Sequence, residues 1–363
     1  MITKIDSLLP VINKDNNFNF LRLFFAFSVA IGHSFYSGGL SLPRIIQTIS
    51  IIFNGHVAVC GFFIISGFLI TRSYALSSNI KEYFAKRCRR LLPAYCLVIM
   101  LCAVSLALIS NLPAREYFTS PGLYKYIIAN LLFLNFLHPG LPGVFGANAS
   151  GSGVNKDIFE INGSLWTIRI EVIFYILIPL IVFAIAKLKT RRRVNAVLAA
   201  AYVFGFLYSI LWGLIAQNSE IYLLKGIRES SDYVAYFVTG IFCLINLEWI
   251  KKYQKYLIVP GMIIVILEYL FTFNTALEFF LPAALGVVIM FVAFNFPSLQ
   301  SVGKYGDYSY GIYIFHGPLI KVFITFGFYD LNNIVVIFAV IGTVFSISYM
   351  SWHFVEKKAL KYR

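Results

Sequence analysis

Two ionisable side chains, Arg22 and His33, lie within the first long apolar segment of the chain, residues 18–36. At about 100° per residue, the eleven steps between them end roughly 20° beyond three full turns, so both side chains share one helix face. Their offset along the helix axis is about 16 Å. A cation and an imidazole on one stripe of an apolar helix are costly unless they line a polar cavity. The pair therefore predicts a functional path along this helix.

Two further arginines, Arg87 and Arg90, precede the apolar segment 91–110. Their spacing of i and i+3 places them on one helix face, and Pro93 is tolerated early in a helix, where its missing N–H costs little. We expect both arginines at a helix N-terminus. Guanidinium groups and a helix N-terminus both favour anions, which predicts a phosphate site. A topology signal is an equally good interpretation.

Glu171 lies in the apolar segment 165–186, where a buried carboxylate needs a partner. Arg169 points to a different helix face, whereas we expect His33 at a similar depth. A contact between Glu171 and His33 would raise the basicity of the imidazole and fix its tautomer. A purely structural ion pair is the alternative interpretation.

Small and cyclic residues flank two other polar side chains. Ser66 and Gly67 lie at the centre of the segment 50–72, where we favour close backbone packing over a ligand contact from Ser66. His316 stands beside Gly317 and Pro318, which suggest a local irregularity in its helix. For His316, a packed structural histidine is favoured over a site residue.

Apolar helices must position these residues. Of the 363 residues, 59% are hydrophobic and 13% charged, and the mean hydropathy is +0.78. Runs of about 20 apolar residues, the length that spans a bilayer, recur along the chain, so we predict an all-α polytopic membrane protein. The first segment lacks a small-residue cleavage site, which indicates a retained helix and not a signal peptide. Eleven segments are candidates: 18–36, 50–72, 91–110, 123–138, 165–186, 194–216, 232–248, 256–272, 277–294, 308–326 and 333–353.

The net charge of +14 comes from basic clusters in short connections, the pattern of the positive-inside rule and not of a nucleic-acid partner. If all eleven segments crossed, the clusters at 81–90 and 187–193 would lie on opposite sides. Segment 123–138 is the shortest and is interrupted by polar residues, so we interpret it as re-entrant or lying on the surface. Ten crossings then remain, with both termini cytoplasmic, including a lead at 1–17 and a basic tail at 354–363.

This topology leaves a long outer stretch, residues 111–164, rich in Gly, Ala, Ser and Asn near its middle. A flexible connector and a lid over a substrate entrance are both compatible with it. None of the five cysteines falls in a predicted outer loop, so we expect no disulfide framework. No spacing of metal ligands occurs, so no metal is predicted.

Together the motifs resemble the acyltransferase 3 family of membrane-bound O-acyltransferases, in the family's order and over nearly the whole chain. Ten helices with both termini inside are also that family's usual topology. The matching residues are Arg22 and His33 in Arg-x10-His, Phe62, Phe63, Ser66, Gly67 and Phe68 in FFxxSGF, Arg87, Arg90 and Pro93 in RxxRLxP, Trp166, Glu171, Phe174 and Tyr175 in LWTxRxExxFY, Ser309, Tyr310, Gly311, Tyr313 and His316 in SYGIYxxH, and a closing Glu356.

The chain also departs from the family pattern. Cys60 and Gly61 stand where an acidic residue often precedes the two phenylalanines, and Lys357 and Lys358 follow the closing glutamate where Lys-Pro is common. These differences argue against carrying over every detail of one relative's site. Some relatives carry a C-terminal SGNH-hydrolase-like domain, which we do not expect here because the chain ends on the predicted cytoplasmic side. Residues 1–363 are expected to form a single integral-membrane domain.

The resemblance implies transfer of an acyl group, most often acetyl, from cytoplasmic acetyl-CoA to a hydroxyl of a cell-surface or lipid-linked glycan, such as lipopolysaccharide O-antigen or exopolysaccharide. It implies that Arg22, Arg87 and Arg90 bind CoA. His33 would be the general base, oriented by Glu171.

Ser66 and His316 are the candidate donors for the oxyanion, and Trp166 is a further candidate site residue. Direct transfer and an acyl-His33 intermediate both stay open. The resemblance also places the protein in the bacterial inner membrane, in contact with its lipids. The alternative function is a transporter or flippase of lipid-linked sugars, which would need no acyl-CoA.

Overall fold

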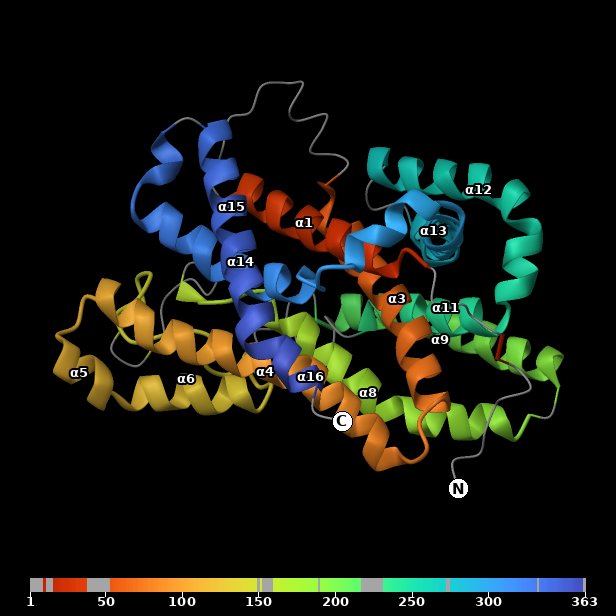
Figure 1. Ribbon diagram of the computed structural model, residues 1–363, viewed down its shortest axis with the longest axis horizontal. Coiled ribbons are helices and arrows are strands. Elements are labelled where there is room, and N and C mark those ends of the chain that lie inside the picture. Colours follow the sequence, from red (N-terminus) through yellow and green to blue (C-terminus); the bar gives the residue numbers. More distant parts are fainter. Residues whose placement is uncertain are drawn as a thin grey trace. The chain divides into compact units, whose positions relative to one another are not determined.

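The computed structural model describes residues 9–10, 16–37, 53–148, 151, 159–188, 190–216, 231–271, 275–331 and 333–361. Within these ranges every regular element is a helix (Figure 1), which confirms the predicted all-α class. The longer helices are α1 (Phe18–Ser37), α3 (Gly55–Ala75), α4 (Ile80–Ser105), α8 (Leu165–Ala186), α9 (Arg191–Ala216), α11 (Val234–Ile245), α12 (Leu247–Leu270), α13 (Thr275–Asn295), α14 (Ser309–Thr325) and α15 (Asn333–Ser351).

Each segment predicted to cross the membrane coincides with one of these helices. Within the described residues, seven spans are long and apolar enough to cross, built on α1, α3, α4, α8, α9, α13 and α15. α11 and α12 pass the same test only together, as a pair bent by 108°. The helices therefore support a multi-pass membrane protein with seven spans, or eight if the bent pair counts as one. The ten crossings and the cytoplasmic termini stay predictions.

Segment 123–138 contains only the short helix α6 (Pro121–Leu131), which follows α5 (Ala114–Thr119). Eleven residues reach about 16 Å, well short of the ~30 Å hydrocarbon core, in agreement with the prediction that this segment does not cross. Ser120 caps α6 by accepting a hydrogen bond from the Gly122 N–H at 3.1 Å. The predicted outer stretch is thus partly helical and not a continuous connector.

Two phenylalanines in the loop after α6 have left-handed backbone: Phe133 at φ 61° and Phe145 at φ 51°. Such a conformation costs a bulky residue about 1–3 kcal/mol and persists only where its surroundings hold it. The Phe133 ring stacks on Tyr95 of α4 with centroids 4.6 Å apart. The Tyr95 hydroxyl donates to the Asn130 carbonyl at 2.8 Å. These contacts fix the turn against α4.

α4 begins earlier than the hydropathy pattern predicts. Asn79 caps it, because its Oδ1 accepts from the Glu82 N–H at 2.8 Å. The Glu82 carboxylate in turn accepts from the Ser78 N–H at 2.7 Å, which completes a reciprocal cap. The prediction that Arg87 and Arg90 stand at a helix N-terminus was therefore wrong. Both lie two turns or more inside α4, where the helix dipole no longer favours an anion.

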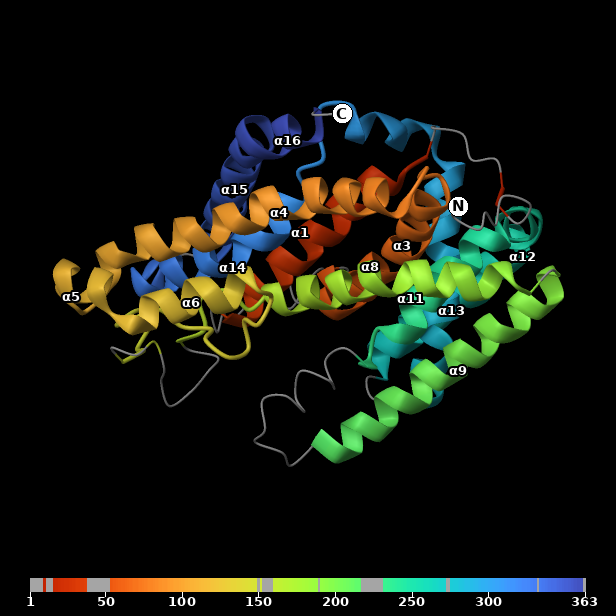
Figure 2. The same ribbon diagram turned by 90° about the horizontal axis from the view of Figure 1, so that it is seen from below.

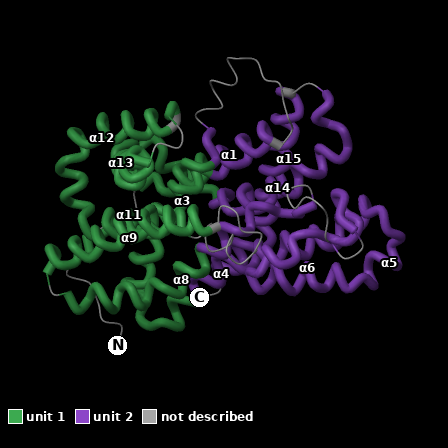
Figure 3. The backbone as a smooth tube through the Cα atoms, turned by 180° about the vertical axis from the view of Figure 1, so that it is seen from behind, with its two compact units in different colours: residues 1–25, 56–85, 171–306 green, residues 26–55, 86–170, 307–363 purple. Residues whose placement is uncertain are grey.

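The chain forms two compact units, each gathered from three stretches of sequence (Figure 3). Unit 1 comprises residues 1–25, 56–85 and 171–306, and unit 2 comprises residues 26–55, 86–170 and 307–363. In unit 2, α14 and α15 pack against each other as a hairpin (Figure 2) joined by the 3₁₀ turn η5 (Phe328–Asp330). A Cβ on Gly311 would lie 2.9 Å from Ser348 Cβ, so only glycine allows this close approach.

In unit 1, the closest backbone approach is between α3 and α11. A Cβ on Gly67 would collide with the Phe237 carbonyl, and one on Gly240 would collide with the Ile64 carbonyl. Small residues facing each other in this way let two apolar helices touch along their backbones. The packing role expected at Gly67 is confirmed.

We expect Gly240→Ala to lower the thermal unfolding midpoint of the detergent-purified protein, because the added methyl group must force α3 and α11 apart. Overpacking of this kind costs about 1–3 kcal/mol. The matched control is Gly213→Ala, since a Cβ at Gly213 has nothing within 4 Å. Equal midpoints for the two variants would contradict the close α3–α11 packing.

Candidate active site

The helices α1 and α14 bring two histidines of unit 2 together. Nδ1 of His33 lies 2.9 Å from Nε2 of His316, and the ring centroids are 5.0 Å apart. The side chain of His316 is 0% exposed, whereas His33 is exposed. The His33 imidazole therefore has one nitrogen against a buried partner, while the residue as a whole is exposed.

His316 is itself fixed by the backbone of α14. Its Nδ1 lies 2.6 Å from the carbonyl oxygen of Tyr313, one turn earlier in the helix. Both ring nitrogens of His316 thus have a partner, one a carbonyl and the other an imidazole. A buried polar ring with both nitrogens engaged has a defined orientation.

α14 continues past His316 although Pro318 interrupts its hydrogen bonding. Proline has no N–H, so the Ile314 carbonyl, four residues earlier, loses its helical donor. The Nδ2 group of Asn162 donates to that carbonyl at 2.8 Å. The Asn162 Oδ1 accepts from the Ser164 hydroxyl at 2.7 Å. The irregularity expected at Gly317 and Pro318 is therefore compensated by a side chain from the segment that precedes α8.

A second contact joins the same two segments. The Thr167 hydroxyl donates to the Ser164 carbonyl at 2.9 Å. Because that proton is engaged, the Tyr313 hydroxyl, 2.7 Å from Thr167 Oγ1, must donate to it. This contact consequently joins the start of α8 to α14 at Tyr313, one turn before His316.

The end of α1 that carries His33 is fixed through its neighbour Ser34. The hydroxyls of Ser34 and Tyr329 lie 2.7 Å apart, and Ser34 is 0% exposed. Burial raises the pKa of Tyr329, while the hydrogen bond with Ser34 acts in the opposite direction. The Ser34–Tyr329 pair is thus a hydrogen bond between two neutral hydroxyls, either of which can be the donor.

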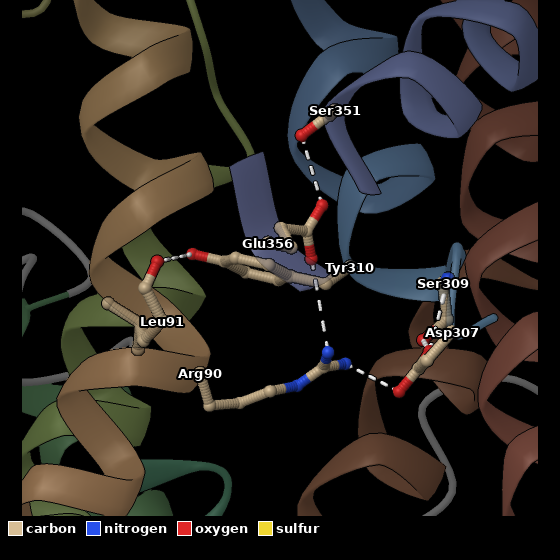
Figure 4. A network of polar contacts seen from close by, with 7 residues as sticks. All are labelled: Arg90, Leu91, Asp307, Ser309, Tyr310, Ser351 and Glu356. Carbon is tan, nitrogen blue, oxygen red and sulfur yellow. Dashed lines mark hydrogen bonds and ion pairs between the residues drawn. The ribbon is translucent and has the colours of Figure 1, made fainter. Parts of the chain in front are cut away.

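Arg90 lies between two carboxylates of unit 2 (Figure 4). Its Nη2 is 2.6 Å from Asp307 Oδ2, and its Nη1 is 3.9 Å from Glu356 Oε2. The guanidinium also lies over the Tyr310 ring, 5.8 Å from the centroid. We call these residues, Arg90, Asp307, Tyr310 and Glu356, the arginine clasp. Its positive charge is balanced by protein carboxylates.

The clasp depends on an interruption of regular α-helix. A π-helix, Trp352–Glu356, follows α15 and leads into α16 (Lys357–Lys361). The wider turn directs Glu356 inward, where it is 1% exposed and accepts from the Ser351 hydroxyl at 3.0 Å. On the other side of the clasp, the Tyr310 hydroxyl donates to the Leu91 carbonyl at 3.1 Å. π-Turns of this kind occur frequently at functional sites.

The other predicted site residues have different surroundings. The Glu171 carboxylate accepts from the Tyr175 hydroxyl, one turn along α8, at 2.7 Å; its predicted contact with His33 stays a prediction. Arg22 shares α1 with His33, as the spacing predicts. Ser66 in α3 and Trp166 in α8 are partly exposed, and their proposed roles are likewise predictions.

Sequence reasoning missed two residues of this region, Asp307 and Asn162. Asp307 had a local signal: it accepts from the Ser309 N–H at 3.3 Å, as an acidic residue does at the start of a helix. For Asn162 the signal was indirect, because Pro318 requires a substitute donor but does not identify it.

Comparisons with known proteins bear on the whole chain. A family model described as an acyltransferase domain matches residues 15–353. An O-acetyl transferase of Shigella phage Sf6 is 26% identical over 96% of this chain and 97% of its own length. Nodulation protein 10 of Rhizobium leguminosarum bv. viciae is 24% identical over 96% of this chain and 94% of its own length. No solved structure matches.

We expect Arg90→Ala to lower the free energy of unfolding, measured by denaturant titration in detergent, by about 3 kcal/mol, because it removes a cation that pairs with Asp307 and with buried Glu356. Arg89→Ala is the matched control, since Arg89 is exposed and a surface change stays within about 0.5 kcal/mol. In a double-mutant cycle with Glu356→Gln, we expect a coupling of roughly 0.5–3 kcal/mol. Additive effects would show that the clasp does not couple the two residues.

Proposed function

The chain belongs to the acyltransferase 3 family, and from this premise we propose that it transfers an acyl group, most simply acetyl, from acyl-CoA to a glycan hydroxyl. The family match over nearly the whole chain and the similarity to a protein named O-acetyl transferase support acyl transfer. The observation that carries the proposal is the arrangement of exposed His33, whose Nδ1 lies 2.9 Å from Nε2 of buried His316.

In the proposed reaction, a hydroxyl oxygen of the acceptor attacks the thioester carbonyl carbon. His33 accepts the hydroxyl proton as general base. The carbon–sulfur bond then breaks, the CoA thiolate leaves, and the proton held by His33 returns to that sulfur. An ester and free CoA result, and His33 is regenerated. Donors for the developing oxyanion are also needed; of the two candidates from the sequence, Ser66 and His316, the second has both of its nitrogens engaged already.

Donor binding is proposed to use the remaining predicted arginines. Arg22 lies on the same face of α1 as His33, and Arg87 lies in α4. Guanidinium groups form paired hydrogen bonds with phosphate oxygens, which suits the phosphates of CoA. Arg90 was predicted to bind CoA as well. Because two carboxylates engage it, we propose instead that it positions α4 against the end of α15.

The proposed setting is the bacterial inner membrane, with acyl-CoA on the cytoplasmic side and a lipid-linked or cell-surface glycan as acceptor. Transfer of an acetyl group to an oxygen atom is consistent with the name of the phage relative, O-acetyl transferase. The seven long apolar helices supply the multi-pass framework that a transfer between the two sides requires.

We expect membranes that contain this protein to transfer label from radiolabelled acetyl-CoA to a glycan fraction of the host. His33→Ala should reduce the transfer by about 10²–10⁴-fold, because a general base contributes that much. His138→Ala is the matched control: this histidine lies in a loop, and within the described part of the chain its hydrogen bond is made by the backbone carbonyl, which accepts from Asn130.

Unchanged transfer by His33→Ala would contradict the role of His33. Transfer that is absent from membranes with the wild-type protein, in a host that bears an acceptor glycan, would contradict acyl transfer from acetyl-CoA. The same membranes should then be tested for ATP-independent movement of lipid-linked sugars, as expected of a transporter or flippase.

A further inference from the structure

We propose that His316 is a positioning residue, which holds His33 in the single tautomer that can act as a base. This inference rests on the proposed function for its consequence, but its geometry is independent of any reaction. It assigns each proton in the row of atoms formed by the Tyr313 carbonyl, His316 and His33.

The row starts at the carbonyl group of Tyr313. A carbonyl oxygen can only accept a hydrogen bond. Nδ1 of His316 lies 2.6 Å from the Tyr313 carbonyl oxygen, so Nδ1 must carry a proton. A neutral imidazole has one N–H, and its other nitrogen is an acceptor. Nε2 of neutral His316 therefore presents a lone pair to His33.

Burial keeps His316 neutral. Its side chain is 0% exposed, and α14 has no carboxylate between its first and last residues. Among the described residues, the groups hydrogen-bonded to the ring are a carbonyl and the His33 imidazole, and neither offers a negative charge. A positively charged His316 without a counter-charge is strongly disfavoured at a fully buried position. A second cation 2.9 Å from His33 would also oppose the charge that His33 gains on accepting a proton.

The assignment at His33 follows. Because Nε2 of His316 accepts, Nδ1 of His33 at 2.9 Å must donate. The proton of neutral His33 is therefore on Nδ1, and Nε2 has the free lone pair. The two nitrogens lie on different edges of the ring, so Nε2 is on the edge that His316 does not engage. The base is thus the nitrogen on the opposite side of the ring from His316.

The two rings therefore have different roles: His33 is the base, and His316 is the acceptor that fixes its tautomer. When Nε2 of His33 takes the proton of the substrate hydroxyl, an imidazolium forms. Its Nδ1–H stays hydrogen-bonded to Nε2 of His316. An aspartate does this work in the Ser-His-Asp triad, where it fixes the tautomer and supports the imidazolium. Here a neutral imidazole fills that role, which avoids placing a carboxylate beside an apolar helix. His316 has no N–H left to donate to substrate.

Two substitutions separate this role from packing. His316→Gln keeps an acceptor near the former position of Nε2, whereas His316→Leu fills similar space without one. We expect His316→Leu to lower kcat for acetyl transfer by about 10²–10⁴-fold, by analogy with the loss caused by a wrong tautomer. The KM for acetyl-CoA should change little, because the hydrogen bonds of His316 with described residues go to Tyr313 and His33 and to none of the arginines proposed to bind CoA. His316→Gln should recover at least about ten-fold of that loss.

A second readout does not depend on catalysis. Diethyl pyrocarbonate modifies an imidazole nitrogen that carries a lone pair, and mass spectrometry of the purified protein reports the modification of each histidine. We expect His33 to be modified in the wild type and in His316→Gln, and several-fold more slowly in His316→Leu. His138 serves as the internal control, with an equal rate in all three proteins.

Each result decides something. Equal kcat for the Leu and Gln variants, or unchanged modification of His33 in His316→Leu, would overturn the positioning role. A higher KM for acetyl-CoA with an unchanged kcat in His316→Leu would also overturn it, because the proposal concerns the base and not the binding of the donor.

If wild-type membranes transfer no acetyl group, the proposed function fails, while the modification rates still test the tautomer. If His316→Leu does not fold, the comparison of wild type with His316→Gln remains, and loss of His33 modification in the Gln variant would contradict the proposal.

Discussion

The hydrogen bond between His33 and His316 is the interaction on which the proposed chemistry depends. An imidazole can serve as a base only with the right nitrogen bare, and an isolated imidazole does not choose between its tautomers for the needs of a site. Here a buried acceptor at 2.9 Å makes the choice. The carbonyl of Tyr313 in turn fixes the acceptor. The position of the proton on His33, in α1, is therefore determined by a backbone carbonyl of α14.

Much of unit 2 keeps that backbone in place. Asn162 replaces the donor that Pro318 lacks, and Tyr313 is held to α8 through Thr167. Ser34 anchors the end of α1 beside His33. The arginine clasp ties the start of α14 to α4 and to the π-helix after α15. Groups on rigid helices, supported by a further layer of hydrogen bonds, hold a geometry better than groups on loops.

Local patterns in the sequence located most helices, because hydropathy and periodicity act over a few residues. They missed the early start of α4, which a reciprocal cap at Asn79 determines and hydropathy does not report. They also missed the bend between α11 and α12. Partners distant in the chain were the least predictable. Nothing in the sequence indicated that His33 contacts His316, 283 positions away, and the contact of His33 with Glu171 stays a prediction. Likewise, the charge pattern marked Arg90 but could not show that Asp307 and Glu356 meet it, because tertiary packing brings them together.

The most direct test of the central claim is the position of the proton on His33. The protein would be labelled with ¹⁵N-histidine and purified in detergent, and the His33 signals identified by their loss in His33→Ala. Long-range ¹H–¹⁵N correlations distinguish a bare ring nitrogen from one that carries a proton. The structure predicts a proton on Nδ1 of His33, a bare Nε2 on His33, and a neutral His316 with its proton on Nδ1. A proton on Nε2 of neutral His33, with Nδ1 bare, would contradict this arrangement.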